Sequence, residues 1–137
     1  MKVSTKARLQ WIEKRLFLAE SGSGNTIVVG NTANADGAKL AATPMELMLM
    51  GAGGCTAFDV VDILEKGRQA VKGCEVMLEA ERAETEPKVF TRIHIHFVVS
   101  GPGLKAAAVE RAVKLSAEKY CSATIIDRKS TRLNSSH

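Results

Sequence analysis

Residues 43–68, TPMELMLMGAGGCTAFDVVDILEKGR, decide the fold that this sequence predicts. The hydroxyl of Thr43, the proline after it and the carboxylate of Glu46 form a capping box, which is typical of a helix start. No charged residue lies between Glu46 and Asp59, so the segment predicts a long helix that is apolar on all sides and therefore buried. We expect this helix to end or bend at Gly67.

Three glycines lie in the middle of the predicted helix, at Gly51, Gly53 and Gly54. In a helix interior each costs about 1 kcal/mol relative to alanine. A helix that keeps three of them is expected to lie close to another backbone there. Cys55 follows directly, so the sequence predicts a thiol in mid-helix, in apolar surroundings, beside a surface without side chains.

The chain before this helix alternates in a pattern typical of short strands. Residues 6–12, 16–20 and 26–29 predict three strands of an antiparallel meander, with the turn-forming segment 21–25 before the third. The first strand is expected to be half-buried, with Ala7, Leu9 and Trp11 on one face.

The chain after the helix predicts a hairpin and a second helix. Residues 74–82 and 89–99 alternate on either side of a turn, and residues 122–126 begin to resemble a further strand. Residues 104–120 predict a helix with the apolar stripe Leu104, Ala108, Ala112 and Leu115. Because strands and helices are segregated along the chain, the order predicts an α+β fold.

Composition limits the classes of function. A chain of 137 residues with a net charge of +4 and no lysine-rich block indicates one domain without a nucleic-acid groove. No continuous apolar run reaches the roughly 18 residues of a membrane span, and the first twenty residues lack a signal-peptide core. Three cysteines without a CxxC motif do not suggest a disulfide framework, so we expect a cytoplasmic protein.

The last eleven residues, DRKSTRLNSSH at 127–137, are identical to the conceptual translation of a widely used sequencing adapter. We therefore expect residues 1–126 to form the native domain, truncated before its last strand, and 127–137 to be a non-native tail. Residues 1–126 hold 16 basic and 14 acidic residues, a net charge of +2, so the basic character of the whole chain carries no functional meaning.

Four motifs in order along residues 4–126 resemble the OsmC/Ohr family of osmotically induced and organic hydroperoxide resistance proteins. They are TPMEL at 43–47, GGC at 53–55, KGRQ at 66–69 and EKYCS at 118–122. The resemblance is greatest to the OsmC-like branch with Gly-Gly-Cys. It implies antiparallel sheets around two long central helices, an intertwined homodimer, and a role in the oxidative stress response.

The resemblance also implies thiol peroxidase chemistry. Cys55 would be the peroxidatic cysteine and Cys121 would resolve its sulfenic acid as a disulfide, with an external thiol or dithiol as reductant and no bound cofactor or metal. Such chemistry needs a thiolate and a second thiol within reach. A nearby arginine would stabilise the thiolate. In the family this arginine lies in the N-terminal strands and usually reaches the partner's cysteine, so the resemblance makes Arg8 and Arg15 the candidates here.

One departure from the family pattern concerns the helper glutamate, which lies ten residues before the peroxidatic cysteine in the hydroperoxide resistance branch. Met45 occupies that position here, and Glu46 lies nine residues before Cys55. Nine helical steps of about 100° turn Glu46 to the side opposite Cys55. Capping explains Glu46 without a catalytic role, although it remains a possible helper.

Alternative interpretations remain open from sequence. Cys55 could instead be a small buried apolar residue that only packs, as free cysteines often do. Cys74, on the apolar face of a strand, is expected to be structural. His94 and His96 share a strand face and could bind a metal, but no third ligand follows, so a polar strand face is favoured. Instead of an enzyme, the chain could be a binding module for a small apolar ligand or a thiol redox sensor.

Overall fold

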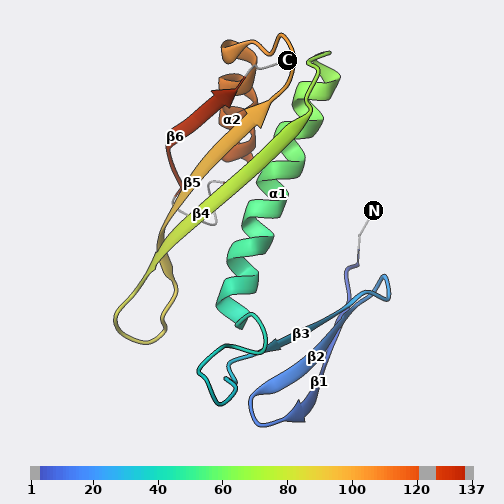
Figure 1. Ribbon diagram of the computed structural model, residues 1–137, viewed down its shortest axis with the longest axis vertical. Helices are drawn as coiled ribbons and strands as arrows, with labels where there is room; N and C mark the ends of the chain where they lie inside the picture. Colours follow the sequence, from blue (N-terminus) through green and yellow to red (C-terminus); the bar gives the residue numbers. More distant parts are fainter. Residues whose placement is uncertain (1–3, 121–125, 135–137) are drawn as a thin grey trace. The chain divides into compact units, whose positions relative to one another are not determined.

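The computed structural model describes residues 4–120 and 126–134 (Figure 1). The elements run β1 (Ala7–Glu13), β2 (Leu16–Ser21), β3 (Thr26–Gly30), α1 (Pro44–Lys66), β4 (Gly73–Arg82), β5 (Phe90–Ser100), α2 (Ala106–Tyr120) and β6 (Ile126–Asn134). They form one sheet of order β1-β2-β3 and a second of order β4-β5-β6. This confirms the α+β class. The chain divides into two compact units, Met1–Met48 and Leu49–His137, and the prediction of a single domain over 1–126 stays a prediction.

The N-terminal unit is the predicted antiparallel meander. Trp11 pairs with Phe17 across β1 and β2, and Phe17 pairs with Val29 across β2 and β3. Lys14, with φ of 49°, turns the chain between the first two strands. The prediction that β1 is half-buried was wrong for the single chain, because every residue of β1 is exposed, including Leu9 and Trp11.

Helix α1 begins with the predicted capping box. The backbone N–H of Thr43 donates to Glu46 Oε1 at 2.9 Å, and the N–H of Glu46 donates to Thr43 Oγ1 at 3.2 Å. Two donors that a helix start leaves without partners are thereby satisfied.

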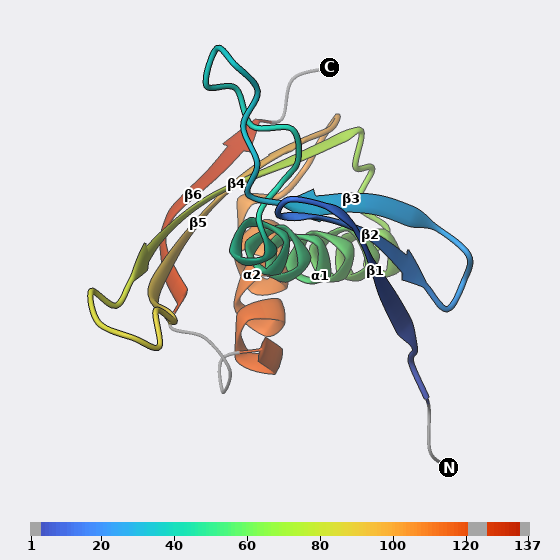
Figure 2. The same cartoon turned by 90° about the horizontal axis from the view of Figure 1, so that it is seen from below.

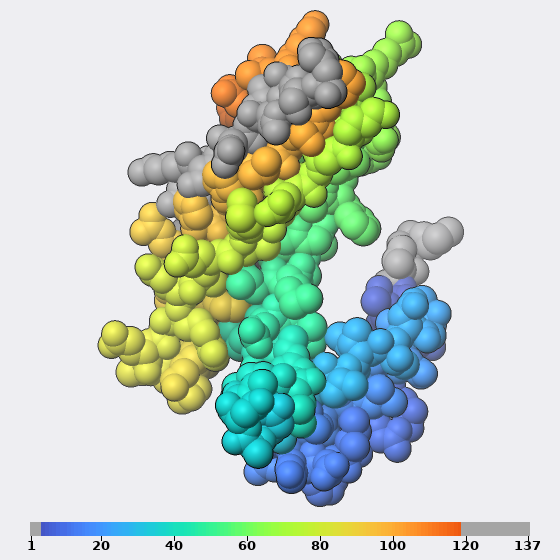
Figure 3. Space-filling model, viewed as in Figure 1, coloured from blue at the N-terminus to red at the C-terminus, as the bar shows by residue number. Residues whose placement is uncertain are grey.

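The prediction that α1 is buried on all sides was wrong for the single chain. Its fully buried residues are Gly53, Thr56, Val60 and Leu64, which recur at helical spacing on one face. Large apolar residues on other faces reach the surface: Met48, Met50 and Phe58. In the space-filling view the colours of α1 are visible along much of its length (Figure 3).

Helix α1 ends at Lys66, one residue before Gly67, where the sequence predicted its end. The residue whose conformation terminates the helix, however, is not Gly67. The N–H of Gln69 donates to the carbonyl of Leu64 and that of Arg68 to the carbonyl of Glu65, which is the Schellman pattern. The residue in the left-handed conformation is Arg68, with φ of 62°, and not Gly67.

The C-terminal unit packs both helices against one face of its sheet. β4 and β5 are antiparallel, whereas β6 runs parallel to β5, so this sheet is mixed. One apolar core joins Val60 and Leu64 of α1, alternate residues of β5 from Ile93 to Val99, and Val109 and Val113 of α2. Figure 2 shows α2 crossing α1 steeply.

The predicted apolar stripe of α2 was partly wrong. Leu104, which precedes the helix, and Ala112 are buried, and Ala108 is half-buried, but Leu115 is exposed. The buried face is rotated, and it includes Val109, Val113, Ser116 and Ala117.

Residues 127–134, expected to be a non-native tail, continue a strand that begins at Ile126, while 122–125 lie outside the described residues. Among the described helices, α1 is long and apolar enough to span a membrane by length and composition alone. Core helices of globular proteins meet the same criterion, and α1 is interrupted by Asp59 and Asp62, so the finding does not contradict the expectation that no continuous apolar run reaches the length of a span.

Candidate thiol site

Cys55 lies in the middle of α1 with its thiol free and exposed. It is next to Thr56, which faces the core, so its side chain leaves the helix about 100° away from the buried face. The expectation of a buried apolar setting was wrong for the single chain. The observed setting leaves the sulfur open to a reagent, which a nucleophilic cysteine requires.

Of the three glycines near Cys55, only one is explained by a close neighbour within this chain. A Cβ added at Gly53 would lie 2.5 Å from Leu78 Cδ1 of β4, so this glycine permits a close approach of the sheet. A Cβ at Gly51 or Gly54 would meet nothing within 4 Å. The neighbour that the sequence predicts for these two glycines is therefore not within the described part of this chain.

Beneath Cys55, α1 and α2 are joined by a buried polar contact. Thr56 Oγ1 and Ser116 Oγ lie 3.1 Å apart, and Ser116 Oγ also donates to the carbonyl of Thr56 at 3.4 Å. Sequence reasoning missed this contact. The sequence does carry a signal for it. In each helix a small hydroxyl residue lies one turn away from a β-branched apolar residue: Thr56 from Val60, and Ser116 from Val113.

Cys121, the predicted resolving cysteine, lies outside the described residues. Its predecessor Tyr120 is the last residue of α2, so the helix that contacts α1 through Ser116 leads directly to it. The pairing of Cys55 with Cys121 stays a prediction.

The predicted helper residues all belong to the N-terminal unit. Arg8 Nη2 donates to Gln10 Oε1 at 3.2 Å, and Arg15 Nη1 donates to the carbonyl of Lys14 at 3.1 Å. The hydrogen bond from the N–H of Thr43 lowers the pKa of Glu46 below its usual range, with a smaller contribution from the Thr43 hydroxyl. The capping function of Glu46 is confirmed, and the catalytic roles of these three residues stay predictions.

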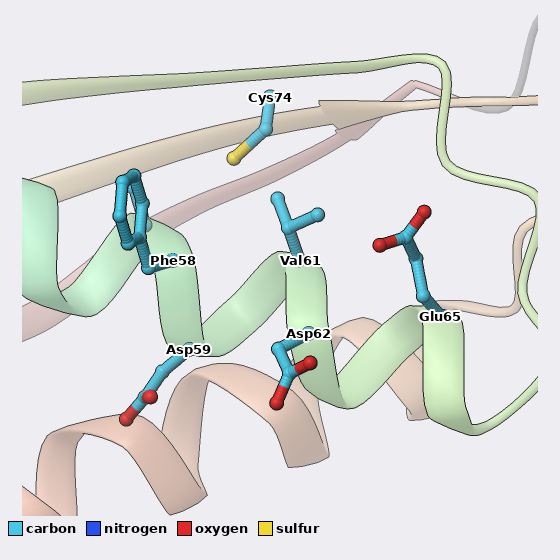
Figure 4. A pocket seen from close by; sticks show the side chains of 7 residues that line it. Phe58, Asp59, Val61, Asp62, Glu65 and Cys74 are labelled. Carbon is cyan, nitrogen blue, oxygen red and sulfur yellow. The ribbon is translucent and has the colours of Figure 1, made fainter.

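Cys74 is the second thiol in the described residues, and its surroundings differ. It is half-buried at the start of β4, and burial raises the pKa of its thiol. It lines a cavity of about 590 Å³ together with residues of α1, among them Phe58, Val61 and Glu65. Figure 4 shows the sulfur directed toward the turn of α1 that carries Phe58 and Val61. Cys55 is not part of this lining.

A second hollow, of about 400 Å³, lies within the N-terminal unit. Apolar side chains of the three strands, Leu9, Phe17 and Val29, form much of its wall, and Arg15, Gly30, Asn31 and Pro44 line the rest. An apolar wall with one guanidinium is chemically suited to an amphipathic anion.

No cluster of metal-binding side chains occurs within residues 4–120. His94 pairs with Glu79 and His96 pairs with Met77 across the β4–β5 hairpin, and both histidines are half-buried. Nowhere among the described residues do three or more His, Cys, Asp or Glu side chains lie together in a way that could hold a metal ion.

A mixed α+β fold with an exposed cysteine in mid-helix defines a class of thiol-bearing proteins, and sequence comparison specifies the family. The profile of the OsmC-like protein family matches residues 35–134. Protein YhfA of Escherichia coli K12 is 50% identical over 133 residues, which cover 96% of each chain. The chain therefore belongs to the OsmC-like family.

Solved structures agree with this assignment. A hypothetical protein from Aquifex aeolicus VF5 is 33% identical with a TM-score of 0.76, over 99% of this chain and 96% of that one. An organic hydroperoxide resistance protein from Elizabethkingia anophelis matches 100% of this chain and 98% of its own with a TM-score of 0.63. At 15% identity this second likeness shows a shared fold alone.

Proposed function

We propose that this protein is a cytoplasmic thiol-dependent peroxidase that reduces organic hydroperoxides or hydrogen peroxide. The observation that carries the proposal is Cys55, a free and exposed thiol on a helix that is held from below by the core. Membership of the OsmC-like family and the fold shared with proteins named for organic hydroperoxide resistance support it.

The chemistry requires two sulfurs and an external reductant. The Cys55 thiolate attacks the peroxide oxygen, the O–O bond breaks, and an alcohol or water leaves after taking up a proton. The Cys121 thiol then attacks the sulfur of the sulfenic acid, forming a disulfide and releasing water. A dithiol returns both cysteines to thiols and is itself oxidised to a disulfide, so electrons and atoms balance.

The proposal includes a homodimer, because apolar surface remains uncovered on this chain. In the N-terminal unit Leu9, Trp11 and Ile27 are each more than half exposed. In the C-terminal unit Phe58 is 81% exposed on α1, close in sequence to the open Gly54. Large apolar residues exposed within a unit are typical of interaction surfaces. A second copy would also bring Arg8 or Arg15 to a partner's Cys55, as family resemblance implies.

A second candidate function is binding of a small apolar or amphipathic ligand without catalysis. The apolar hollow of the N-terminal unit with Arg15 in its wall favours this alternative. A thiol sensor would need the same cysteine pair as the peroxidase, but it would not turn over.

Peroxide consumption tests the enzyme directly. Wild-type protein with dithiol is expected to consume cumene hydroperoxide through many turnovers, and Cys55→Ser is expected to reduce the rate at least about 100-fold, because a hydroxyl is not ionised near neutral pH. Cys74→Ser is the matched control and should keep the rate. Equal rates for wild type and Cys55→Ser would refute the enzyme proposal, and a single turnover without recycling would favour the sensor.

A further inference from the structure

A cavity of the C-terminal unit has no part in the proposed peroxidase chemistry. It has a volume of about 590 Å³ and lies between α1 and the start of β4. This volume is within the range of sites that bind small molecules. Cys55, the proposed nucleophile, does not line it. The cavity can therefore be considered as a second site with its own ligand.

The wall of the cavity is mainly apolar. Its apolar side chains are Ala57, Phe58 and Val61 of α1, and the half-buried thiol of Cys74 lies opposite them on β4. Phe58 and Val61 are three positions apart, so they are neighbours on the surface of the helix. Figure 4 shows both of them on the side of α1 that faces the Cys74 sulfur. A chain of methylene groups laid along this stripe would be shielded from water by the helix and the strand.

The charges around the cavity are all negative. Three carboxylates belong to its lining, and within the described part of the chain no basic side chain does. Two of the three already interact with other groups: Asp62 Oδ2 lies 2.9 Å from Lys66 Nζ, and Asp59 is not free either. In Figure 4 Asp59 and Asp62 lie on the side of α1 away from Cys74.

Glu65 is the third carboxylate, and it continues the apolar stripe. It lies four residues after Val61 and seven after Phe58, which places it about 10 Å further along the helix than the phenyl ring. Figure 4 shows its carboxylate on the side of α1 that faces Cys74. Among the described residues Glu65 forms no ion pair, because the neighbouring Lys66 is bound to Asp62. One end of an apolar trough therefore carries an uncompensated negative charge.

We propose that this cavity binds a small amphipathic cation, an ammonium group with a short alkyl chain. The ammonium donates hydrogen bonds to the Glu65 carboxylate, and the chain lies on Val61 and the ring of Phe58. Charge complementarity decides the class of ligand, because the same trough would repel a carboxylate with the same chain. The site does not use Cys55, so it stands or falls independently of the peroxidase.

Isothermal titration calorimetry with n-octylammonium chloride tests the site in the full-length protein. The neutral n-octanol and the anionic octanoate carry the same chain and serve as matched ligands. We expect octylammonium to bind at least about 10-fold more tightly than octanol, and octanoate to bind more weakly than either. Added sodium chloride should weaken the binding of octylammonium and leave that of octanol unchanged, since Glu65 is exposed.

Variants of Glu65 locate the ammonium. Glu65→Gln keeps the size of the side chain but removes its charge, so octylammonium should bind at least about 10-fold more weakly while octanol binds as before. Glu75→Gln is the matched control, because Glu75 is also exposed and directly follows Cys74 but does not line the cavity. It should retain the wild-type affinity, and so should Cys55→Ser.

The outcomes separate this proposal from the others. Equal affinities of wild type and Glu65→Gln for octylammonium would overturn it, and so would an affinity for octanol equal to that for octylammonium. Absence of binding to wild type would also overturn it, and is the result expected if a second copy of the chain fills the cavity beside Phe58. Selective binding of octylammonium by a protein that consumes no peroxide would uphold the cation site and reject the peroxidase.

Discussion

Cys55 and Cys74, both described thiols of the C-terminal unit, differ in their surroundings. Burial raises the pKa of Cys74, so near neutral pH it remains a protonated, poorly nucleophilic thiol in the wall of a cavity. Cys55 is exposed on α1 and has no such cover from the described chain. This contrast agrees with the sequence interpretation of Cys74 as structural.

Glu46 makes a pH-dependent contribution to stability. Its pKa is lowered from 4.5 in the folded protein by the hydrogen bonds with Thr43, so its stabilising effect is present above the unfolded value and is lost as pH falls through the lower folded value. We expect Glu46→Gln to lower the melting temperature at pH 7. Glutamine can accept the same hydrogen bond from Thr43, but it lacks the negative charge that strengthens this bond. The difference from wild type should shrink between pH 5 and roughly pH 3.

Thermal unfolding followed by circular dichroism across this pH range measures the effect. Thr43→Ser keeps both hydrogen bonds of the capping box and should retain the wild-type pH profile. Parallel profiles for wild type and Glu46→Gln, with a constant gap down to the lowest pH, would show that the charge on Glu46 does not contribute.

Helix α1 illustrates which parts of an element the sequence can predict. Its start was predicted correctly, because Thr43 and Glu46 interact with each other through local hydrogen bonds. Its end close to Gly67 was also predicted, but the left-handed conformation of Arg68 was not, since glycine is the usual residue in that conformation. In α2, alanines did not distinguish the faces, and Val109 and Val113 were the more informative residues.

The left-handed conformation of Arg68 yields a stability prediction. A residue with a Cβ pays about 1 kcal/mol in this region, whereas glycine does not. Arg68→Gly should therefore be more stable than Arg68→Ala by about 1 kcal/mol, since both variants lose the same charge at the helix end. Urea unfolding of the two variants measures the difference.

Gly67 supplies the matched control for that comparison. A Cβ at Gly67 would lie 3.4 Å from the carbonyl oxygen of Ile63, an ordinary contact, and its φ is not in the left-handed region. Gly67→Ala should therefore be tolerated. If Gly67→Ala is strongly destabilising while the two Arg68 variants are equal, then the helix ends at Gly67 as the sequence first indicated.

For the molecule as a whole, the N-terminal meander, the β4–β5 hairpin and the helix positions followed from local patterns, whereas burial and the parallel pairing of β6 with β5 did not. Periodicity reports which faces are apolar, but it does not say whether the chain itself or another molecule covers them. Helix α1 was expected to be buried and strand β1 half-buried, and both present apolar residues at the surface of the single chain. The thiol site has the same limit, because the partner groups predicted for Cys55 lie in the N-terminal unit or outside the described residues.

The homodimer proposal explains these exposed residues together, and Phe58 tests it. Burial of a phenylalanine side chain contributes up to about 3 kcal/mol, and an aspartate in its place would also carry an unpaired charge into an interface. Phe58→Asp should therefore weaken dimerisation by at least roughly 100-fold, because each 1.4 kcal/mol is a factor of ten. Sedimentation velocity over a range of protein concentrations measures the change.

Met77→Asp is the matched control and should leave the dimer intact. Met77 is 44% exposed on the outward face of β4, next to Glu75 and Glu79 along the same face. A wild-type protein that sediments as a monomer at every concentration would remove the homodimer, and with it the route by which Arg8 or Arg15 reaches a thiol.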